Sequence, residues 1–354
     1  MKKQYYLNHS QIDVYFKQSK DDFVVTELPL YEFTGEGEHI ILKIRKKDLT
    51  TWDALEIIAS NIGCRSRDIG YAGLKDKNAM TIQYISIHKD YEEKVDKFTH
   101  EQIKILEKTY HKNKIKIGHL KGNKFFIRLK RVQKIDKMKL ESALGEIATY
   151  GIPNYFGFQR FGIDGDNYLK GKEIIDGKRK EKNRKLKNMY INSYQSYLFN
   201  SWLSKRIEIS KLISGFKAKE IASTVGLDAV EVEELQKQPH PFKIMNGDIL
   251  NHYPYGKLFS IEDNIQQEAQ QFYDRDRVPT GLLVGKKTKI ATNSALKFEQ
   301  EFIKDANIDG ARRFAWIFPT QINSEFKEEK NWFELSFELP KGSYATEVIR
   351  ELVH

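Results

Sequence analysis

An aspartate between two lysines is the part of this sequence best suited to chemistry. Asp76 stands between Lys75 and Lys77, shortly after a glycine and directly before an expected strand. Cations within a few ångströms favour the carboxylate and keep its pKa low. In an extended segment both lysines would point away from Asp76, whereas a turn would let them converge on it. The residues alone leave two interpretations, a carboxylate prepared for catalysis and a surface turn with solvent-screened charges, and they favour the turn.

Familiar cofactor motifs are incomplete in the chain. Three residues separate Gly281 from Gly285 where a phosphate-binding P-loop needs four, and Lys287 stands where Ser or Thr should follow Lys286. The sequence contains no Gly-x-Gly-x-x-Gly, Gly-x-Ser-x-Gly or His-Glu-x-x-His. Cys64 is the single cysteine, which excludes an internal disulfide and a cysteine-built metal site. The sequence does not decide whether carboxylates converge to bind two metal ions, and no pattern indicates such a site.

Basic residues outnumber acidic ones in the 354-residue chain. There are 59 Lys and Arg against 49 Asp and Glu, a formal net charge of +10. Such an excess makes a polyanion partner such as nucleic acid plausible, or it serves only solubility. Seven of the ten residues in 178–187 are basic. We find neither an apolar run of membrane-spanning length nor an N-terminal signal sequence, and we expect a cytosolic protein with no membrane partner.

The hydrophobic patterns predict an α+β fold. The expected strands are 23–29, 39–46, 81–88, 115–120 and 125–132, with helices over 51–62, capped by Thr50 or Thr51, and 136–150. The middle of the chain looks different, with a long helix over 190–209, helical segments in 217–237 and then a proline-rich, turn-rich region. Strand signals return only at 312–318 and 332–339, before a helix over 345–353. One domain split by an insertion is the simplest explanation.

Residues 71–83, Tyr-Ala-Gly-Leu-Lys-Asp-Lys-Asn-Ala-Met-Thr-Ile-Gln, resemble the signature of the TruD family of tRNA pseudouridine synthases. Further matches follow in the family's order over nearly the whole chain. They are residues 22–27 (Asp-Phe-Val-Val-Thr-Glu), 35–39 (Gly-Glu-Gly-Glu-His), 121–125 (Lys-Gly-Asn-Lys-Phe), 151–162 (Gly-Ile-Pro-Asn-Tyr-Phe-Gly-Phe-Gln-Arg-Phe-Gly), 194–200, 279–281 and 339–351. A long ordered series is far harder to produce by chance than one short motif.

The resemblance implies an enzyme that isomerises a uridine in RNA, at position 13 of certain tRNAs in bacterial members, to pseudouridine. The glycosidic bond is broken, the uracil turns over and its C5 rejoins the ribose, without metal, nucleotide or redox cofactor. Asp76 matches the essential aspartate of the family. It would act either as nucleophile toward the sugar or as the base that removes the 2′ proton. The target uridine is expected to be flipped out of the RNA.

The resemblance also implies residues that contact the target nucleotide. Phe23, Asn123 and Tyr344 match such positions, where an amide can bind the uracil edge and a ring can stack on the base. Phe23 opens a strand, however, and such an aromatic is usually part of a core. Lys17 is the candidate for a cation beside the catalytic carboxylate, and Lys20 competes with it.

Four further residues belong to the predicted substrate-binding set. Lys75 and Lys77 flank the catalytic carboxylate. Phe125 lies in the Gly-Asn-x-Phe motif, although its alternation with Ile127 and Leu129 predicts a core position. Arg160, in Phe-Gln-Arg-Phe, is expected to make either a hinge contact or an RNA contact.

We therefore predict two domains. Residues 1–152 and 310–354 form the catalytic domain, with a mixed, mainly antiparallel sheet of the pseudouridine synthase type, and residues 153–309 form an inserted α/β TRUD domain. tRNA is expected in the cleft between them, and a monomer suffices. The competing hypotheses are a non-catalytic RNA-binding or RNA-chaperone protein and, among enzymes, a metal-dependent RNA nuclease or a methyltransferase.

Overall fold

The computed structural model describes residues 3–16, 19–75, 77, 79–304 and 306–354. Contacts divide the chain into two compact units, which we describe one at a time. The sheet unit consists of residues 12–141 and 319–342, and the helical unit of residues 1–11, 142–318 and 343–354. The predicted limits of the catalytic and inserted domains stay a prediction, because compact units need not coincide with the domains of a family.

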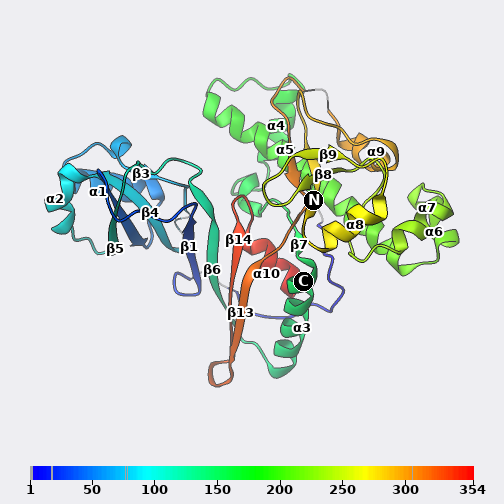
Figure 1. The fold of residues 1–354 in the computed structure, drawn as a ribbon, viewed down its shortest axis with the longest axis horizontal. Helices are drawn as coiled ribbons and strands as arrows, with labels where there is room; N and C mark the ends of the chain where they lie inside the picture. The colour runs from blue at the N-terminus through cyan, green and yellow to red at the C-terminus, as the bar shows by residue number, and fades with distance from the viewer. Residues whose placement is uncertain (1–2, 17–18, 76, 78, 305) are drawn as a thin grey trace. The chain divides into compact units, whose positions relative to one another are not determined.

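One large sheet dominates the sheet unit (Figure 1). Its strand order is β13-β14-β6-β1-β4-β2-β5, with β3 paired to β4. Among the described residues every pairing in this sheet is antiparallel except that of β1 with β4. The strands are β1 Phe23–Pro29, β2 His39–Lys46, β3 Gly70–Tyr71, β4 Met80–His88, β5 Ile103–His111, β6 Leu120–Lys130, β13 Thr320–Lys327 and β14 Trp332–Pro340. A mixed, mainly antiparallel sheet was predicted and is confirmed.

Helix α1 (Thr51–Ile62) begins and ends where the sequence predicts. The Thr50 side chain accepts a hydrogen bond from the Asp53 N–H, and the Asp53 carboxylate accepts one from the Thr50 N–H, which forms a capping box. Gly63 ends the helix in the left-handed conformation (φ 74°). The buried side of α1 packs in one apolar cluster with residues of β2 and β4. The unit also contains α2 (Glu92–Asp96), and the boundary between the units falls within α3 (Lys134–Tyr150).

The helical unit is built around the long helix α5 (Arg184–Gly215), most of which is buried from Tyr190 to Ile213. The other helices are α4 Asn167–Ile175, α6 Ala218–Val225, α7 Ala229–Gln236, α8 Ile265–Tyr273, α9 Asn293–Glu299 and α10 Ala345–Val353. A four-stranded sheet (order β11-β10-β8-β9) and a two-stranded one (β12-β7) complete the unit. These strands are β7 Ile152–Pro153, β8 Ile249–His252, β9 Leu258–Ser260, β10 Arg277–Leu283, β11 Ala311–Phe314 and β12 Trp316–Ile317.

Strand β10 explains why the chain has a glycine at position 281. Strand and helix α5 approach so closely there that a Cβ atom on Gly281 would collide with the ring of Trp202. Only glycine permits this approach without displacing the helix or the ring.

Several strand predictions were wrong. Residues 115–119 form no strand. The strands on either side of them do pair, β5 with β2 and β6 with β1. The patterns also missed β5 and β13, the two edges of the large sheet. Most residues of β13 are exposed and polar, and in β5 the apolar alternation is limited to Ile103 and Ile105. Strands β8, β9 and β10 lie within the region predicted to be turn-rich, where Pro279 is itself part of β10. In the described part of the chain, no helix combines the length and apolar character that a membrane crossing requires.

Candidate functional site

Lys75, the residue before Asp76, is held by three elements of the sheet unit. Its backbone N–H donates to the Thr51 hydroxyl at the start of α1, at 2.9 Å. Its ammonium donates to the Glu27 carboxylate on β1, at 2.6 Å. Its carbonyl accepts from the Lys46 ammonium at the end of β2, at 3.4 Å. These three contacts therefore hold Lys75, the residue before Asp76, in place.

The Glu27–Lys75 ion pair is buried. The side chains are 1% and 6% exposed. Burial raises the pKa of the Glu27 carboxyl, while the Lys75 ammonium and a hydrogen bond from the Tyr84 N–H act in the opposite direction. A buried pair of this kind adds little net stability, but removal of one partner leaves the other charge uncompensated. The pair therefore acts mainly as a constraint that holds Lys75, and with it the chain just before Asp76, against β1.

Phe23, Asn123 and Phe125 lie on the same face of the sheet as Glu27. Strand register places Glu27 opposite Asn123 and Val25 opposite Phe125. Side chains of paired residues point to the same face, and alternate residues of a strand share a face. The Phe23 and Phe125 rings are both 6% exposed, with centroids 6.2 Å apart. The core position predicted for Phe125 is confirmed, and Phe23 is equally buried.

Polar atoms without partners collect on this face. Among the described residues, Asn123 Oδ1, Thr81 Oγ1 and Gln83 Nε2 are buried and make no hydrogen bond. The register Val25–Thr81 puts Thr81, and therefore Gln83, on the face of Glu27. Buried polar atoms without partners are costly, and few occur in a native structure unless a ligand or a reaction uses them. This face therefore offers hydrogen-bonding groups to a polar ligand.

The predictions for Asp76 and Lys17 lie outside the described residues. Lys77 is exposed to solvent, in contrast to Lys75. Lys20, the alternative to Lys17, forms an ion pair with Asp48. Of the two lysines that flank Asp76, one is thus engaged inside the unit and the other faces solvent.

Tyr344 and Arg160 come together in the helical unit, around the buried ring of Phe156. The Tyr344 and Phe156 ring centroids are 6.2 Å apart, and the Arg160 guanidinium lies 5.4 Å from the Phe156 centroid. Arg160 also donates to Ser196 on α5, at 3.2 Å. The Arg313 guanidinium lies 3.9 Å from the same ring centroid, and burial lowers its pKa to about 10. Arg160, Arg313 and Tyr344, the residue before α10, therefore form a cluster of cationic and aromatic side chains around Phe156.

Sequence reasoning did not assign a site role to the buried polar residues around Lys75. Glu27, Lys46 and Thr51 contact it, and Gln83 accepts a hydrogen bond from Thr51. A signal for Glu27 was present, because the alternation of β1 puts it on the buried face with Phe23 and Val25. A carboxylate on such a face requires a partner. Arg313 gave no comparable signal, since the residues that surround it, among them Asn154 and Phe156, are far from it in the chain.

Comparison with known proteins identifies the family. The model described as tRNA pseudouridine synthase D (TruD) matches residues 1–182, 180–234 and 232–352. The chain is 54% identical to tRNA pseudouridine synthase D of Nitratiruptor, over 100% of this chain and 98% of that protein. It is 51% identical to the protein of the same name from Sulfurimonas denitrificans, over 98% and 97% of the two chains.

A solved structure shares the fold. The crystal structure of the putative tRNA pseudouridine synthase D (TruD) from Methanosarcina mazei matches with a TM-score of 0.73 and 21% identity, over 99% of this chain and 95% of that chain. The chain belongs to the TruD family of tRNA pseudouridine synthases, a family of isomerases. The resemblance seen in the motifs is confirmed, and so is the pseudouridine synthase type of fold. In the described part of the chain no group of three or more His, Cys, Asp or Glu side chains is arranged to hold a metal ion.

We expect Glu27→Gln to destabilise the sheet unit by about 3 kcal/mol, because it leaves the Lys75 ammonium buried without a counter-charge. Glu27→Gln combined with Lys75→Met should cost less than the sum of the two single changes, since it removes both charges. Denaturant unfolding of the four proteins measures this coupling.

The matched control is the more accessible pair Lys43–Glu107 in the same sheet, at 2.7 Å, whose side chains are 22% and 63% exposed. Its Lys43→Gln and Glu107→Gln changes should each cost under about 1 kcal/mol. Additive effects at Glu27 and Lys75, no larger than those of the control, would contradict a buried pair that constrains the segment.

Proposed function

We propose that this protein converts a uridine of tRNA, at position 13, to pseudouridine, with Asp76 as the catalytic residue. The observation that carries the proposal is the anchoring of Lys75 by Thr51, Glu27 and Lys46, next to the face that presents Asn123. Full-length membership of the TruD family supports it.

The reaction needs groups that position a base and a carboxylate that reacts. The C1′–N1 bond breaks, the uracil rotates, a C1′–C5 bond forms, and the C5 proton is lost while N1 is left with a proton. Substrate and product have the same atoms and the same oxidation state, so the balance calls for no redox partner. Asp76 acts in its ionised form, either as nucleophile toward the sugar or as base for the 2′ proton.

Asn123 and Tyr344 supply the contacts proposed for the flipped base. The Asn123 amide, whose Oδ1 makes no hydrogen bond within the described residues, can bind the uracil edge. The Tyr344 ring can stack on the base, as aromatic rings do on bases taken out of an RNA strand. Arg160, which contacts the same Phe156 ring as Tyr344, supports that ring or meets the RNA backbone.

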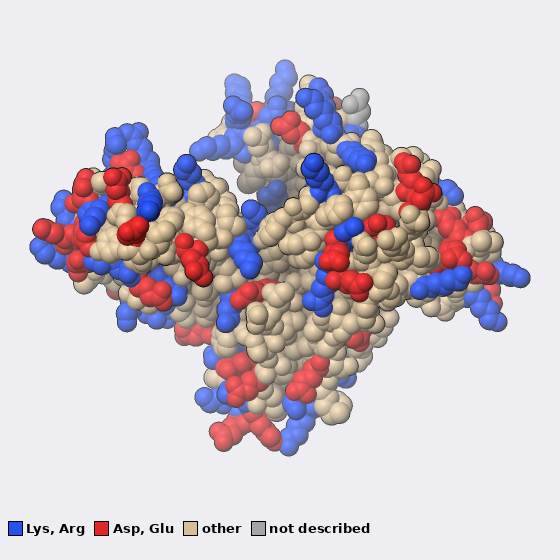
Figure 2. All heavy atoms as spheres, viewed as in Figure 1, with Lys and Arg blue, Asp and Glu red and all other residues tan. Residues whose placement is uncertain are grey.

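Surface charge supplies affinity for the RNA. All Lys and Arg side chains of residues 178–187 are exposed. Figure 2 shows Lys and Arg gathered over α4 and the loop that leads to α5. Contacts between such groups and phosphates release counterions, so binding should weaken steeply with salt. We propose that one chain suffices for the reaction.

We expect Asp76→Asn to abolish pseudouridine formation while tRNA binding stays within a few-fold of the wild type, because the change removes the reacting carboxylate and leaves the basic surface intact. Tritium release from tRNA carrying 5-tritiated uridine measures the reaction, in EDTA and without added cofactor. Release that continues in this variant would overturn the catalytic assignment. An absence of release by the wild-type protein, with binding intact, would favour a non-catalytic RNA-binding protein.

We expect Gly157→Ala to lower kcat/KM for tRNA about tenfold, because the new methyl group would lie 2.7 Å from the Tyr344 ring and displace it. Gly157 has an ordinary backbone conformation (φ −69°), so alanine adds no backbone strain. The control is Gly145→Ala in α3, where a methyl group meets nothing within 4 Å. Equal kcat/KM values for the two variants would contradict a role for Tyr344 in positioning the base.

A further inference from the structure

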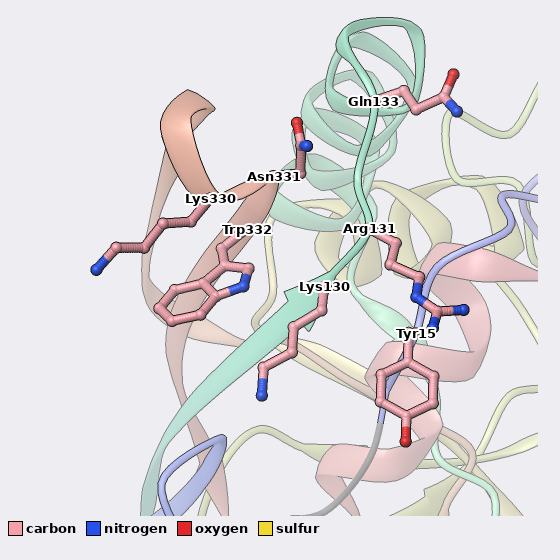
Figure 3. A pocket seen from close by; sticks show the side chains of 7 residues that line it. All are labelled: Tyr15, Lys130, Arg131, Gln133, Lys330, Asn331 and Trp332. Atoms are coloured by element: carbon pink, nitrogen blue, oxygen red, sulfur yellow. The ribbon is translucent and has the colours of Figure 1, made fainter.

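A second concentration of positive charge lies in the sheet unit, in a pocket of about 530 Å³. The pocket lies where β6 ends and β14 begins, and residue 15 pairs with the end of β6. Its lining consists of Tyr15, Lys130, Arg131, Gln133, Lys330, Asn331 and Trp332 (Figure 3). None of these residues belongs to the candidate catalytic site.

The backbone around this pocket is tightly fixed. Tyr15 and Lys130 exchange two backbone hydrogen bonds, at 2.9 and 3.0 Å, and Trp332 lies opposite Lys130 in the β6–β14 register. Arg131 adopts the left-handed conformation (φ 60°), which is uncommon for a residue that carries a long side chain. A conformation of this kind persists only where the surrounding structure enforces it, and such positions are concentrated at functional sites.

The cations of the pocket fall into two groups. Lys130 forms an ion pair with Asp22, at 2.5 Å. Arg131 and Lys330, by contrast, form no ion pair with any carboxylate among the described residues. They lie over aromatic rings instead, Arg131 at 5.2 Å from the Tyr15 centroid and Lys330 at 4.9 Å from that of Trp332. A ring orients a cation without neutralising it, so both charges stay available to an external anion.

Three carboxylates near the pocket are paired with cations other than Arg131 and Lys330. Arg128, stacked on Trp332 at 4.4 Å, is paired with Asp22 and Glu334. Asp22 and Glu334 are thus taken up by Arg128 and Lys130, and neither pairs with Arg131 or Lys330. Glu328, in the turn before β14, is paired with Lys134.

We propose that this pocket binds the phosphodiester backbone of the RNA, with Arg131 and Lys330 as the phosphate contacts. In Figure 3 these two side chains lie on opposite sides of Lys130, with Arg131 beside Tyr15 and Lys330 directed away from it. Charges spread in this way suit successive phosphates of a chain better than one small anion. Basic groups beside aromatic rings that solvent can reach, here the exposed Tyr15 and the half-buried Trp332, are also the combination by which proteins hold nucleic-acid strands. The RNA partner rests on the proposed function, whereas the phosphate contacts rest on the pocket itself.

The test is the salt dependence of tRNA binding by Arg131→Asn combined with Lys330→Gln. Asparagine tolerates the left-handed conformation, so the change removes charge without added backbone strain. Loss of two phosphate contacts should reduce the slope of log K against log salt by about 1.5 and weaken binding about tenfold at 100 mM salt. The kcat at saturating tRNA should not change, because neither residue belongs to the catalytic site.

Two further double variants serve as controls. Lys97→Gln combined with Lys104→Gln removes the same charge near the β5 edge of the sheet, where both residues are exposed, and should leave the slope unchanged. Arg131→Lys combined with Lys330→Arg retains the charge and should keep both slope and affinity. Thermal melting verifies that each variant is folded.

The proposal is overturned if the Arg131→Asn, Lys330→Gln protein keeps the wild-type slope. It is also overturned if the Lys97, Lys104 control loses as much affinity, because net charge rather than the pocket would then explain the effect. These measurements use binding alone, so they stand even if the wild-type protein forms no pseudouridine. Failure of the proposed function and failure of the pocket are therefore distinguishable.

Discussion

The buried ion pair between Glu27 and Lys75 is the constraint on which the rest of the site depends. A charge taken out of water is expensive unless a partner meets it, so Glu27 and Lys75 can be buried only together. That requirement ties the segment before Asp76 to β1. The hydrogen bonds to Thr51 and from Lys46 add the start of α1 and the end of β2. A net gain in stability is not needed for this role, because the pair specifies one arrangement over others.

The positively charged side chains of this protein fall into two groups, those bonded inside the units and those exposed at the surface. Positive groups inside the two units are engaged, as Lys75 is by Glu27 and Arg313 is by its hydrogen bonds to Asn154. The cations available to a polyanion lie on the surface, in residues 178–187 and in the pocket with Arg131 and Lys330. Affinity for RNA thus arises from many exposed groups that respond to salt, whereas the proposed chemistry rests on one carboxylate.

The sequence predicted several elements that bury an apolar face, but it missed the mostly exposed edge strand β13 and also the buried strands β8 and β10, which lie in a proline-rich region. Strands β1, β2 and β14 and helices α1 and α10 carry clear apolar periodicity and lie where predicted. Of the two edge strands, β13 lacks that signal, and in β5 it is limited to Ile103 and Ile105. For the site, motif matches selected Asn123 and Tyr344, but periodicity could not show that Arg313 meets Phe156 or that Lys46 contacts Lys75. Those contacts join residues far apart in the chain, and only packing determines them.

The most direct test of the central claim is the single-turnover rate of pseudouridine formation, at saturating tRNA, by the protein with both Glu27→Gln and Lys75→Met. Its charges are removed together, so it should fold. Its tRNA binding should stay within a few-fold of the wild type, because the Lys75 ammonium is bonded to Glu27 and only 6% of its side chain is exposed. If the pair holds the segment that positions Asp76, the rate should fall at least tenfold, since small displacements of a reacting group are costly. A rate equal to that of the wild type would contradict the account.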